Sequence, residues 1–281
     1  HSGFVALQLA LAVVLLVAAG ILGRTLLGLA QLDPGIDAHN VLVARVAVSP
    51  GAFSSPQQTR AAWREFLESA RRAPGAQSVA ISDVIPMRAG INSLPYWNSP
   101  SLPPPDKMPS AITSTVSPDY WRAMGIPLRS GRLLTEQDRM GAEQVIVIDE
   151  VLAQHAFKDR EAVGSYLWVP ALGRAPVRVV GVVGHVRHWG LAGDEQSPIR
   201  DQIYCSFDQT PDSLLRLFSG FMSVAIRTGP APLTIVEPVR QALRSTNHTL
   251  YEVRTMEQLA SASLSRQRFL LTLFGIFSGV A

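Results

Sequence analysis

The apolar residues of this chain gather at its two ends. From residue 1 to residue 23 there is no Asp, Glu, Lys or Arg, and Gln8 is the only strongly polar side chain in the run FVALQLALAVVLLVAAGILG. A helix of about 20 residues is about 30 Å long, which matches the hydrocarbon thickness of a bilayer. A signal peptide would need a basic leading segment and a shorter apolar core. We therefore predict a transmembrane helix, which continues past Arg24 and stops at the turn Asp33-Pro34-Gly35.

The C-terminal end repeats the pattern. After Arg268 the sequence reads FLLTLFGIFSGVA, 13 uncharged residues that run to the last position. This run is too short to cross a bilayer, but it stops at the end of the chain and not at a polar boundary. We interpret Phe269–Ala281 as the start of a second span and the sequence as a piece of a longer protein. Arg24, Arg266 and Arg268 flank the apolar segments and can extend to lipid headgroups.

The middle of the chain alternates between strand and helix patterns. β-branched residues alternate over Val41–Val48 and predict a strand. Ser55 and Pro56 suit the cap and first position of a helix. Its apolar stripe follows at helical spacing: Trp63, Phe66, Leu67 and Ala70. AQSVAISDVI then has a strand pattern, so these segments form one predicted β-α-β unit.

A second unit of the same form lies far downstream. FMSVAIRTG and TLYEVRTM are strand patterns, and the segment between them places Val236, Val239 and Leu243 on one face of a helix. Pro238 removes a hydrogen bond inside a helix unless it occupies the first turn, so this helix is expected to start late or to kink. The two units predict one α/β subdomain into which a second subdomain is inserted.

The inserted region is predicted to be mixed and rich in sheet. In SPDYWRAMG, Ser117 is placed as a helix cap and Gly125 follows the end, which indicates a short helix. Asp149 can cap the helix EVLAQHAF, which follows the strand EQVIVID. SYLWV, PVRVVGVVGHVRHW and RDQIYCSF add further predicted strands. The predicted fold class is therefore α+β.

Composition and charge exclude little. The formal net charge is +3, and Lys107 and Lys158 are the only lysines. No basic cluster interleaved with aromatic residues indicates a nucleic-acid-binding face, so we expect no nucleic-acid partner. Cys205 is the only cysteine, which excludes an internal disulfide; we interpret it as a small buried hydrophobe.

The stretch VVGVVGHVRHWGL is the strongest candidate for chemistry, because it carries His185 and His188. Its valines predict a strand over Val177–Val186, on which the two imidazoles would point to opposite faces. They could then share no metal ion, and no third ligand lies nearby in the sequence. The glycines are followed by no helix whose amides could hold a phosphate. We interpret the stretch as a core strand that leads into a loop at Trp189-Gly190.

Seven segments of the chain occur in an order that resembles the order found in a known family. LQLALAVVLLVAAGILGRTLLGL, LDPGIDAHNVLVARV, VSPDYWRAMGIPLRSGR, VIVIDEVLAQHAF, AVGSYLWV, VVGVVGHVRHWGL and YEVRTMEQLASASLSRQRF follow one another along the chain. Together they resemble the periplasmic core region of MacB-type, FtsX-like ABC-transporter permeases, and above all the orphan duplicated permeases related to them. The resemblance covers nearly the whole chain, and its segments are structural.

This resemblance implies an architecture and a location in the bacterial inner membrane. The implied units are a transmembrane helix and stalk (1–32), a porter-like subdomain in two parts (33–116 and 217–258), an inserted sheet-rich subdomain (117–216), and a juxtamembrane helix with the start of a second transmembrane helix (259–281). Residues 33–258 would be extracytoplasmic, and three further membrane helices would begin at Phe269.

The resemblance also implies a function and partners. The domain would couple motion of the transmembrane helices to export or mechanotransmission, without catalysis. The implied partners are the membrane, a second copy bound through the membrane helices, a separate ATPase subunit and a periplasmic adaptor. No nucleotide-binding motif (Gly-x-x-x-x-Gly-Lys-Ser/Thr) occurs in the chain, so ATP hydrolysis would come from another subunit.

The alternative is a membrane-anchored extracytoplasmic hydrolase or ligand-binding module. No Gly-x-Ser-x-Gly or His-Glu-x-x-His motif occurs, and we assign no catalytic, cofactor-binding or metal residue. A hydrolase would have to draw on five residues: His155, His185, His188, Asp149 and Asp194. Three of these meeting within hydrogen-bonding reach in a cleft would favour it.

Overall fold

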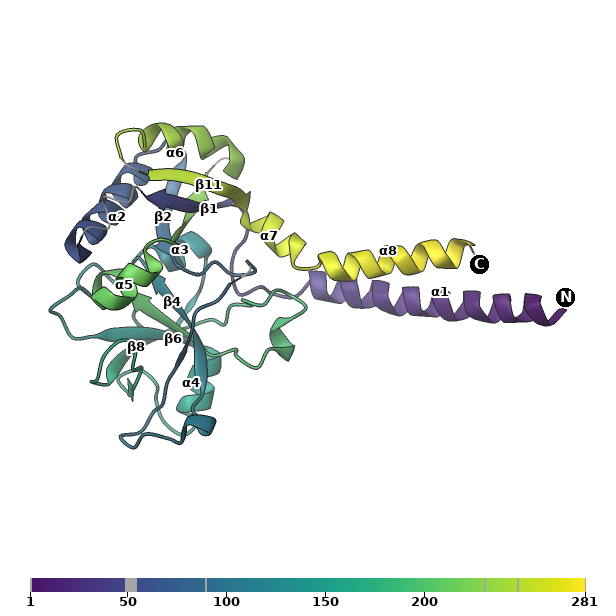
Figure 1. The fold of residues 1–281 in the computed structure, drawn as a ribbon, viewed down its shortest axis with the longest axis horizontal. Coiled ribbons are helices and arrows are strands. Elements are labelled where there is room, and N and C mark those ends of the chain that lie inside the picture. The colour runs from purple at the N-terminus through teal and green to yellow at the C-terminus, as the bar shows by residue number, and fades with distance from the viewer. Residues whose placement is uncertain (1, 49–54, 89, 230, 247, 281) are drawn as a thin grey trace.

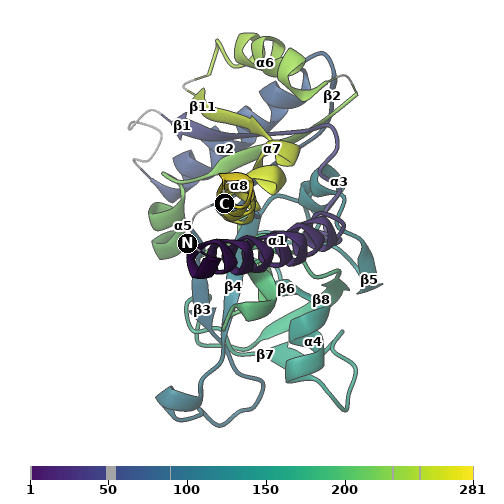
Figure 2. The same cartoon turned by 90° about the vertical axis from the view of Figure 1, so that its right-hand side faces the viewer.

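Two helices project from a folded body. The computed structural model describes residues 2–48, 55–88, 90–229, 231–246 and 248–280, so Ala281 lies outside it, as does the side chain of Arg266. Helices α1 (Ser2–Ala30) and α8 (Ser265–Val280) leave the body side by side, and we call this pair the stalk (Figures 1 and 2).

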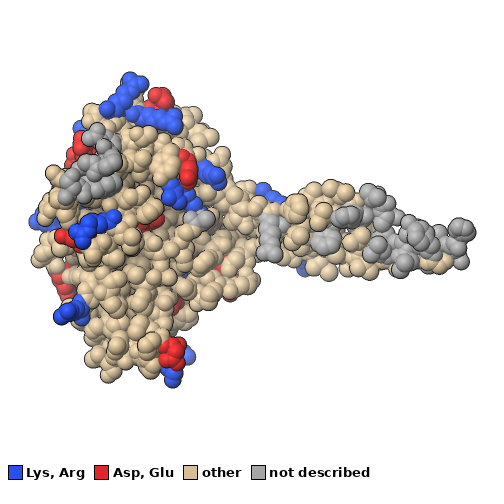
Figure 3. All heavy atoms as spheres, viewed as in Figure 1, with Lys and Arg blue, Asp and Glu red and all other residues tan. Residues whose placement is uncertain are grey.

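The stalk is apolar. Within the described residues, Val13–Ala30 of α1 is the one stretch long and apolar enough to cross a membrane, with a mean hydropathy of 2.2 and none of it buried in the protein. On the face seen in Figure 3, charged residues spread over the body, and the described part of the stalk shows them only near its root.

The first half of the body contains the two predicted β-α-β units. They comprise β1 (Val41–Val48), α2 (Pro56–Arg71), β2 (Ala76–Ser82), β10 (Ser223–Thr228), α6 (Val236–Ala242) and β11 (His248–Thr255). Their strands are antiparallel in the order β11-β1-β10-β2, so the two units interleave as a split β-α-β arrangement. The Ser55 hydroxyl caps α2 as predicted, and α6 begins at Val236, which puts Pro238 in the first turn.

The second half extends the same sheet. It contributes β3 (Ser93–Pro95), β4 (Ser110–Val116), β5 (Leu128–Gly131), β6 (Val145–Asp149), β7 (Tyr166–Leu167), β8 (Val177–Val183) and β9 (Gln202–Ser206). The order continues β2-β4-β9-β6-β8-β5, and the only residue pair between β2 and β4 in the described sheet is Ser82 with Val116. β4 precedes the boundary expected after residue 116 but pairs with β9, and the subdomain limits stay a prediction.

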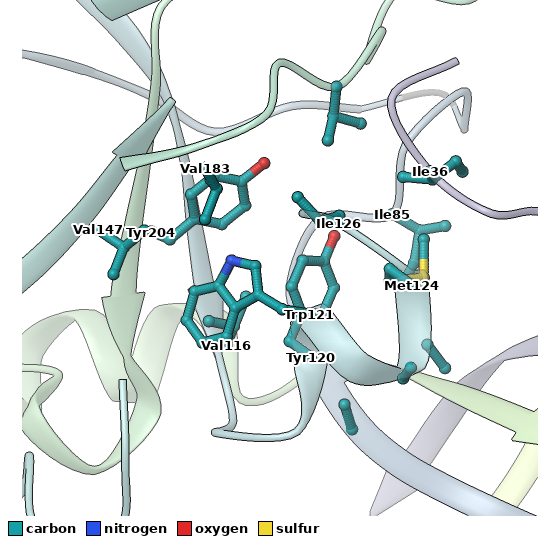
Figure 4. Packing of buried hydrophobic residues seen from close by; sticks show 14 of the residues in the cluster. Ile36, Ile85, Val116, Tyr120, Trp121, Met124, Ile126, Val147, Val183 and Tyr204 are labelled. Carbon is teal, nitrogen blue, oxygen red and sulfur yellow. The ribbon is translucent and has the colours of Figure 1, made fainter. Parts of the chain in front are cut away.

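An apolar core crosses the join between the halves. The rings of Tyr120 and Trp121, in α3 (Tyr120–Met124), lie 6.0 and 6.1 Å from the ring of Tyr204 in β9 (Figure 4). The same buried cluster contains Val43 from the first half and Val147 from the second. The halves are therefore held together by side-chain packing more than by strand pairing.

Three local predictions were wrong. Ser117 does not cap α3, which begins at Tyr120 after Asp119; its hydroxyl instead accepts the N–H of Ile81 in β2 at 3.0 Å. The valine-rich strand β8 ends at Val183 and not at Val186, because its neighbour β6 ends opposite that residue, where α4 (Glu150–Ala156) begins. The predicted strand SYLWV is also shortened, to β7.

Candidate functional site at the root of the stalk

The first helix of the stalk is tied to the segment that follows β8. We call that segment, residues 184–200, the root loop. The predicted turn after α1 is present: the Asp33 carboxylate accepts the N–H of Gly35 at 2.8 Å, and Gly35 has a φ of +77°. Arg187 of the root loop donates its N–H to the Pro34 carbonyl and its Nε–H to the Asp33 carbonyl, both at 3.0 Å. The exit of α1 is therefore fixed to the root loop.

A second set of contacts anchors the same exit to the first half. The N–H of Asp37 donates to the Met124 carbonyl at 2.9 Å. Arg227 of β10 donates to the carboxylate and to the carbonyl of Asp37, each at 2.9 Å, and to the carbonyl of Ala123 at 3.1 Å. Burial opposes ionisation of Asp37, but the N–H of His39 and the charge of Arg227 hold its pKa below the usual value.

The second helix of the stalk also contacts the root loop. β11 leads into α7 (Met256–Ala262), whose N-terminus carries a capping box between Thr255 and Gln258. Ser263 then connects α7 to α8, and its hydroxyl accepts the N–H of Leu191 at 3.4 Å. Gly190, with a φ of +86°, packs against Ser263. The root loop therefore contacts the chain just after α1 and just before α8, where the two helices of the stalk join the body.

A buried charge cluster holds the base of the root loop. His185 lies between two carboxylates, with Nδ1 2.6 Å from Asp149 and Nε2 2.8 Å from Asp194. The side chain of His185 is 10% exposed, and those of the two aspartates are at most 1% exposed. Burial lowers the pKa of His185, but the hydrogen bonds to Asp149 and Asp194 outweigh it and raise this pKa to about 9. The imidazole is therefore a cation near neutral pH, paired on both sides.

His188 is in the opposite state. Its side chain is fully buried, and burial lowers its pKa to about 4 despite the nearby charge of Asp194. Its carbonyl accepts the N–H of Met87 at 3.0 Å, which ties the root loop to the chain beyond β2. The two histidines thus differ in charge at neutral pH although they are three residues apart.

Three of the five residues singled out from the sequence meet here. Asp149, His185 and Asp194 lie within hydrogen-bonding reach, and His185 lines a cleft of about 580 Å³ that also borders Gly35 and Arg187. His155 lies elsewhere, paired with Asp201 at 2.7 Å. The opposite-face argument for the histidines does not apply, because both follow the end of β8.

The cluster has the geometry of an ion pair and not of a catalytic triad. A general base needs one free ring nitrogen beside a nucleophile, but each ring nitrogen of His185 faces a carboxylate. Asp149 is also committed to the backbone, since it accepts the N–H groups of Leu152 and Gln202 at 3.0 Å. Among the described residues, no group of three or more His, Cys, Asp or Glu side chains is arranged to hold a metal ion.

Sequence reasoning missed the residues that hold the stalk. Arg187, Arg227 and Ser263 belong to no motif, and their partners are distant along the chain; Arg227 and Asp37 are 190 positions apart. The sequence predicts the turns at Gly35 and Gly190, but not what these glycines pack against. A lone arginine within the strand pattern VAIRTG was the one available hint.

The fold and this site define a class: a mixed α+β domain whose first and last elements are helices that leave the body side by side, with one loop contacting the chain beside each of them. Comparison with known families gives the particular one. Residues 2–245 match the family described as the MacB-like periplasmic core domain, and the chain belongs to that family. It is thus the periplasmic core domain of a MacB-like ABC-transporter permease of the inner membrane.

Known relatives are similar over parts of the chain. The macrolide export ATP-binding/permease protein MacB of Agrobacterium fabrum is 36% identical over 86 residues, which cover 30% of this chain and 13% of that protein. The uncharacterised ABC transporter permease YknZ of Bacillus subtilis is 23% identical over 176 residues, 61% of this chain and 41% of that protein. The matched regions therefore span less than half of either relative.

A solved structure shares the fold. The periplasmic region of MacB from Actinobacillus actinomycetemcomitans aligns with a TM-score of 0.50 at 16% sequence identity, covering 81% of this chain and 94% of that one. The α+β fold class predicted from the sequence patterns is confirmed, and so is the resemblance to MacB-type permeases.

Proposed function

We propose that this domain is a mechanical coupling element, which converts relative motion of its membrane helices into motion of the periplasmic body. The root loop carries the proposal, because it contacts Pro34 after α1 and Ser263 before α8. A shift of one helix against the other therefore acts on a single segment. The buried ion pair between His185 and Asp149 fixes the base of that segment to β6 in the second half of the body, and the pair between His185 and Asp194 lies within the segment.

The body is suited to transmit such motion as two joined halves. The halves share one residue pair between β2 and β4 and an apolar core centred on α3. Asp37, after α1, contacts that core through Met124 and the first half through Arg227. A displacement at the root thus reaches the join directly.

The proposal extends to the energy source and the assembly of the protein, by analogy with the family. The relatives include a macrolide export ATP-binding/permease protein and an ABC transporter permease. We propose that ATP hydrolysis in a separate subunit drives the helices, that two copies pair through them, and that export through a periplasmic adaptor or mechanotransmission is the output. The domain itself is non-catalytic in this proposal, since His185 has both ring nitrogens engaged.

Displacing one helix tests the coupling. Gly23 of α1 lies against Leu271 of α8, and a β-carbon there would be 3.7 Å from the Leu271 Cδ1 atom. Gly23→Leu should therefore push α8 away. Spin labels at Met140→Cys and Leu233→Cys, which are exposed and lie in different halves, report the distance between the halves. Cys205 is buried and burial raises its pKa, so it stays unlabelled.

The matched control is Gly20→Leu. Gly20 lies on the same helix, and a β-carbon there has no described atom within 4 Å, so the added side chain is equally apolar but starts from open space. We expect Gly23→Leu to change the distribution of distances between the halves and Gly20→Leu to leave it as in the parent chain. An unchanged distribution for Gly23→Leu, with the helices shown to have separated, would contradict coupling.

A further inference from the structure

The root loop carries an exposed aromatic ring beside the membrane helices. Trp189 is 40% exposed, whereas Trp63 and Trp121 are buried in the body. Its neighbours in the sequence fix its position: Arg187 bonds Pro34, four residues after the end of α1, and Gly190 packs against Ser263, two residues before α8. Figure 1 shows the green segment between β8 and β9 reaching to the start of the stalk.

This position corresponds to the headgroup layer. The apolar candidate span ends at Ala30, and each headgroup region adds roughly 5–8 Å beyond the hydrocarbon. With the hydrocarbon ending at Ala30, Pro34 and the root loop that contacts it would lie at that depth. Tryptophan is enriched at this depth in membrane proteins.

The exposed surface of Trp189 is apolar. Its indole N–H already donates to the Ile199 carbonyl at 2.7 Å, so the polar edge of the ring is satisfied within the loop. The part that remains uncovered is hydrocarbon, and removing it from water is favourable. The internal hydrogen bond also holds the ring in one orientation.

The loop presents no net charge to the membrane. Arg187 pairs with Glu195 at 3.0 Å, and Arg200 pairs with Glu195 at 3.1 Å and with Asp194 at 3.5 Å. With His185, a cation between Asp149 and Asp194, the loop and its base hold three cations and three anions. Burial keeps His188 neutral near pH 7. A surface of this kind needs no anionic lipid to attract it.

We propose that the Trp189 face of the root loop is a membrane contact, which rests in the headgroup layer of zwitterionic phospholipid beside α1 and α8. The body would then be attached to the membrane at three places, through α1, through α8 and through this lipid contact at the root of the stalk. The inference adds this third attachment to the proposed coupling function. Its existence does not depend on helix motion being transmitted, so each proposal can fail without the other.

Depth-dependent quenching tests the contact. The chain carrying Trp189→Cys, labelled with an environment-sensitive fluorophore, is placed in phosphatidylcholine nanodiscs that contain a headgroup nitroxide lipid. The control is Tyr166→Cys, which is similarly exposed at 44% but pairs with Arg178, at the end of β8 away from the root loop. We expect loss of most of the fluorescence at position 189 and little loss at position 166.

A second measurement covers the case in which labelling disturbs the loop. Unlabelled wild-type chain and Trp189→Phe are compared by intrinsic fluorescence in the same nanodiscs, and nitroxide should quench the wild type more. Equal quenching at positions 189 and 166, together with equal intrinsic quenching in the unlabelled pair, overturns the proposal. Quenching that requires anionic phosphatidylglycerol also overturns it, because the contact is derived from an uncharged surface.

Discussion

Gly35, at the exit of α1, lies directly against the carbonyl oxygen of His185 in the root loop. A β-carbon on Gly35 would overlap that oxygen, and the φ of +77° is one that other residues rarely adopt. The close approach is available only to glycine. It brings the exit of α1 onto the loop that also contacts Ser263 before α8, and the proposed function is inferred from this relationship.

Gly35→Ala is therefore expected to destabilise the contact between the exit of α1 and the root loop by more than the backbone strain of an alanine at this φ would account for. Gly141→Ala is the matched control, since Gly141 has a φ of +91° and open space around it. Strain from a left-handed alanine, about 1–2 kcal/mol, applies to both variants, and only Gly35→Ala adds the overlap with His185. Denaturant unfolding should give a larger loss for Gly35→Ala. Equal losses would show that the contact with His185 does not constrain the junction.

Removing the imidazole between Asp149 and Asp194 should cost far more than removing an exposed one. His185→Leu leaves buried carboxylates without their cation, which typically costs about 3–5 kcal/mol. His155→Leu also breaks a His–Asp pair with a 2.7 Å contact, but its side chain is 63% exposed and the expected loss is below about 1 kcal/mol. A similar free energy of unfolding for the two variants would contradict the buried-cluster assignment.

The two histidines should give stability opposite pH dependence. The folded-state pKa of His185, about 9, lies above its unfolded value of about 6.5, so its contribution is full below pH 6.5 and is lost as pH rises through 9. The folded-state pKa of His188, about 4, lies below 6.5, so stability is lost as pH falls from 6.5 towards 4.

Unfolding measured across this pH range separates the two effects. His185→Leu should remove the alkaline loss, and His188→Leu should reduce the acid loss. Asp83, whose pKa burial raises to about 7, titrates in every variant, so the difference from wild type removes its contribution. The difference for His185→Leu reports the whole cluster, because His185 also stabilises the charged forms of Asp149 and Asp194. A His188→Leu chain with the full acid sensitivity of wild type would show that His188 is not the buried neutral group described.

Arg227 should not be replaceable by lysine. Its guanidinium donates in several directions at once, to Asp37 and to the carbonyl of Ala123, which a single ammonium group cannot reproduce. We expect Arg227→Lys to lower the free energy of unfolding by about 1–3 kcal/mol. Arg240→Lys is the control, because Arg240 is half-exposed and 4.0 Å from Glu237. Equal losses of unfolding free energy for Arg227→Lys and Arg240→Lys would contradict the proposed role of the Arg227 hydrogen bonds.

The sequence predicts features that depend on near neighbours. The caps at Ser55 and Asp149, the stripe at Trp63 and the late start caused by Pro238 all follow from contacts within about four residues. The interleaving of β10 between β1 and β2 was not predicted, because strand pairing joins segments far apart in the chain.

The site could not be predicted from the sequence either, because its residues are brought together by segments that are far apart in the chain. The sequence named Asp149, His185 and Asp194, but not their meeting, since β8 was expected to continue through His185. Where β8 ends depends on where its neighbour β6 ends, and that is a property of the assembled sheet. Arg227, which donates hydrogen bonds to Asp37, belongs to no sequence motif that would have identified its partner.

Hydrogen exchange at the root loop tests the central claim most directly. Gly23→Cys and Leu271→Cys are joined with a short bis-maleimide, which fixes α1 against α8; the same variant capped with a monofunctional maleimide is the control. If the loop joins both helices, the link should slow exchange of the Arg187 and Leu191 amides, which bond Pro34 and Ser263, and leave the amides of β6 unchanged. Exchange at the root loop that is the same with and without the link would contradict the account.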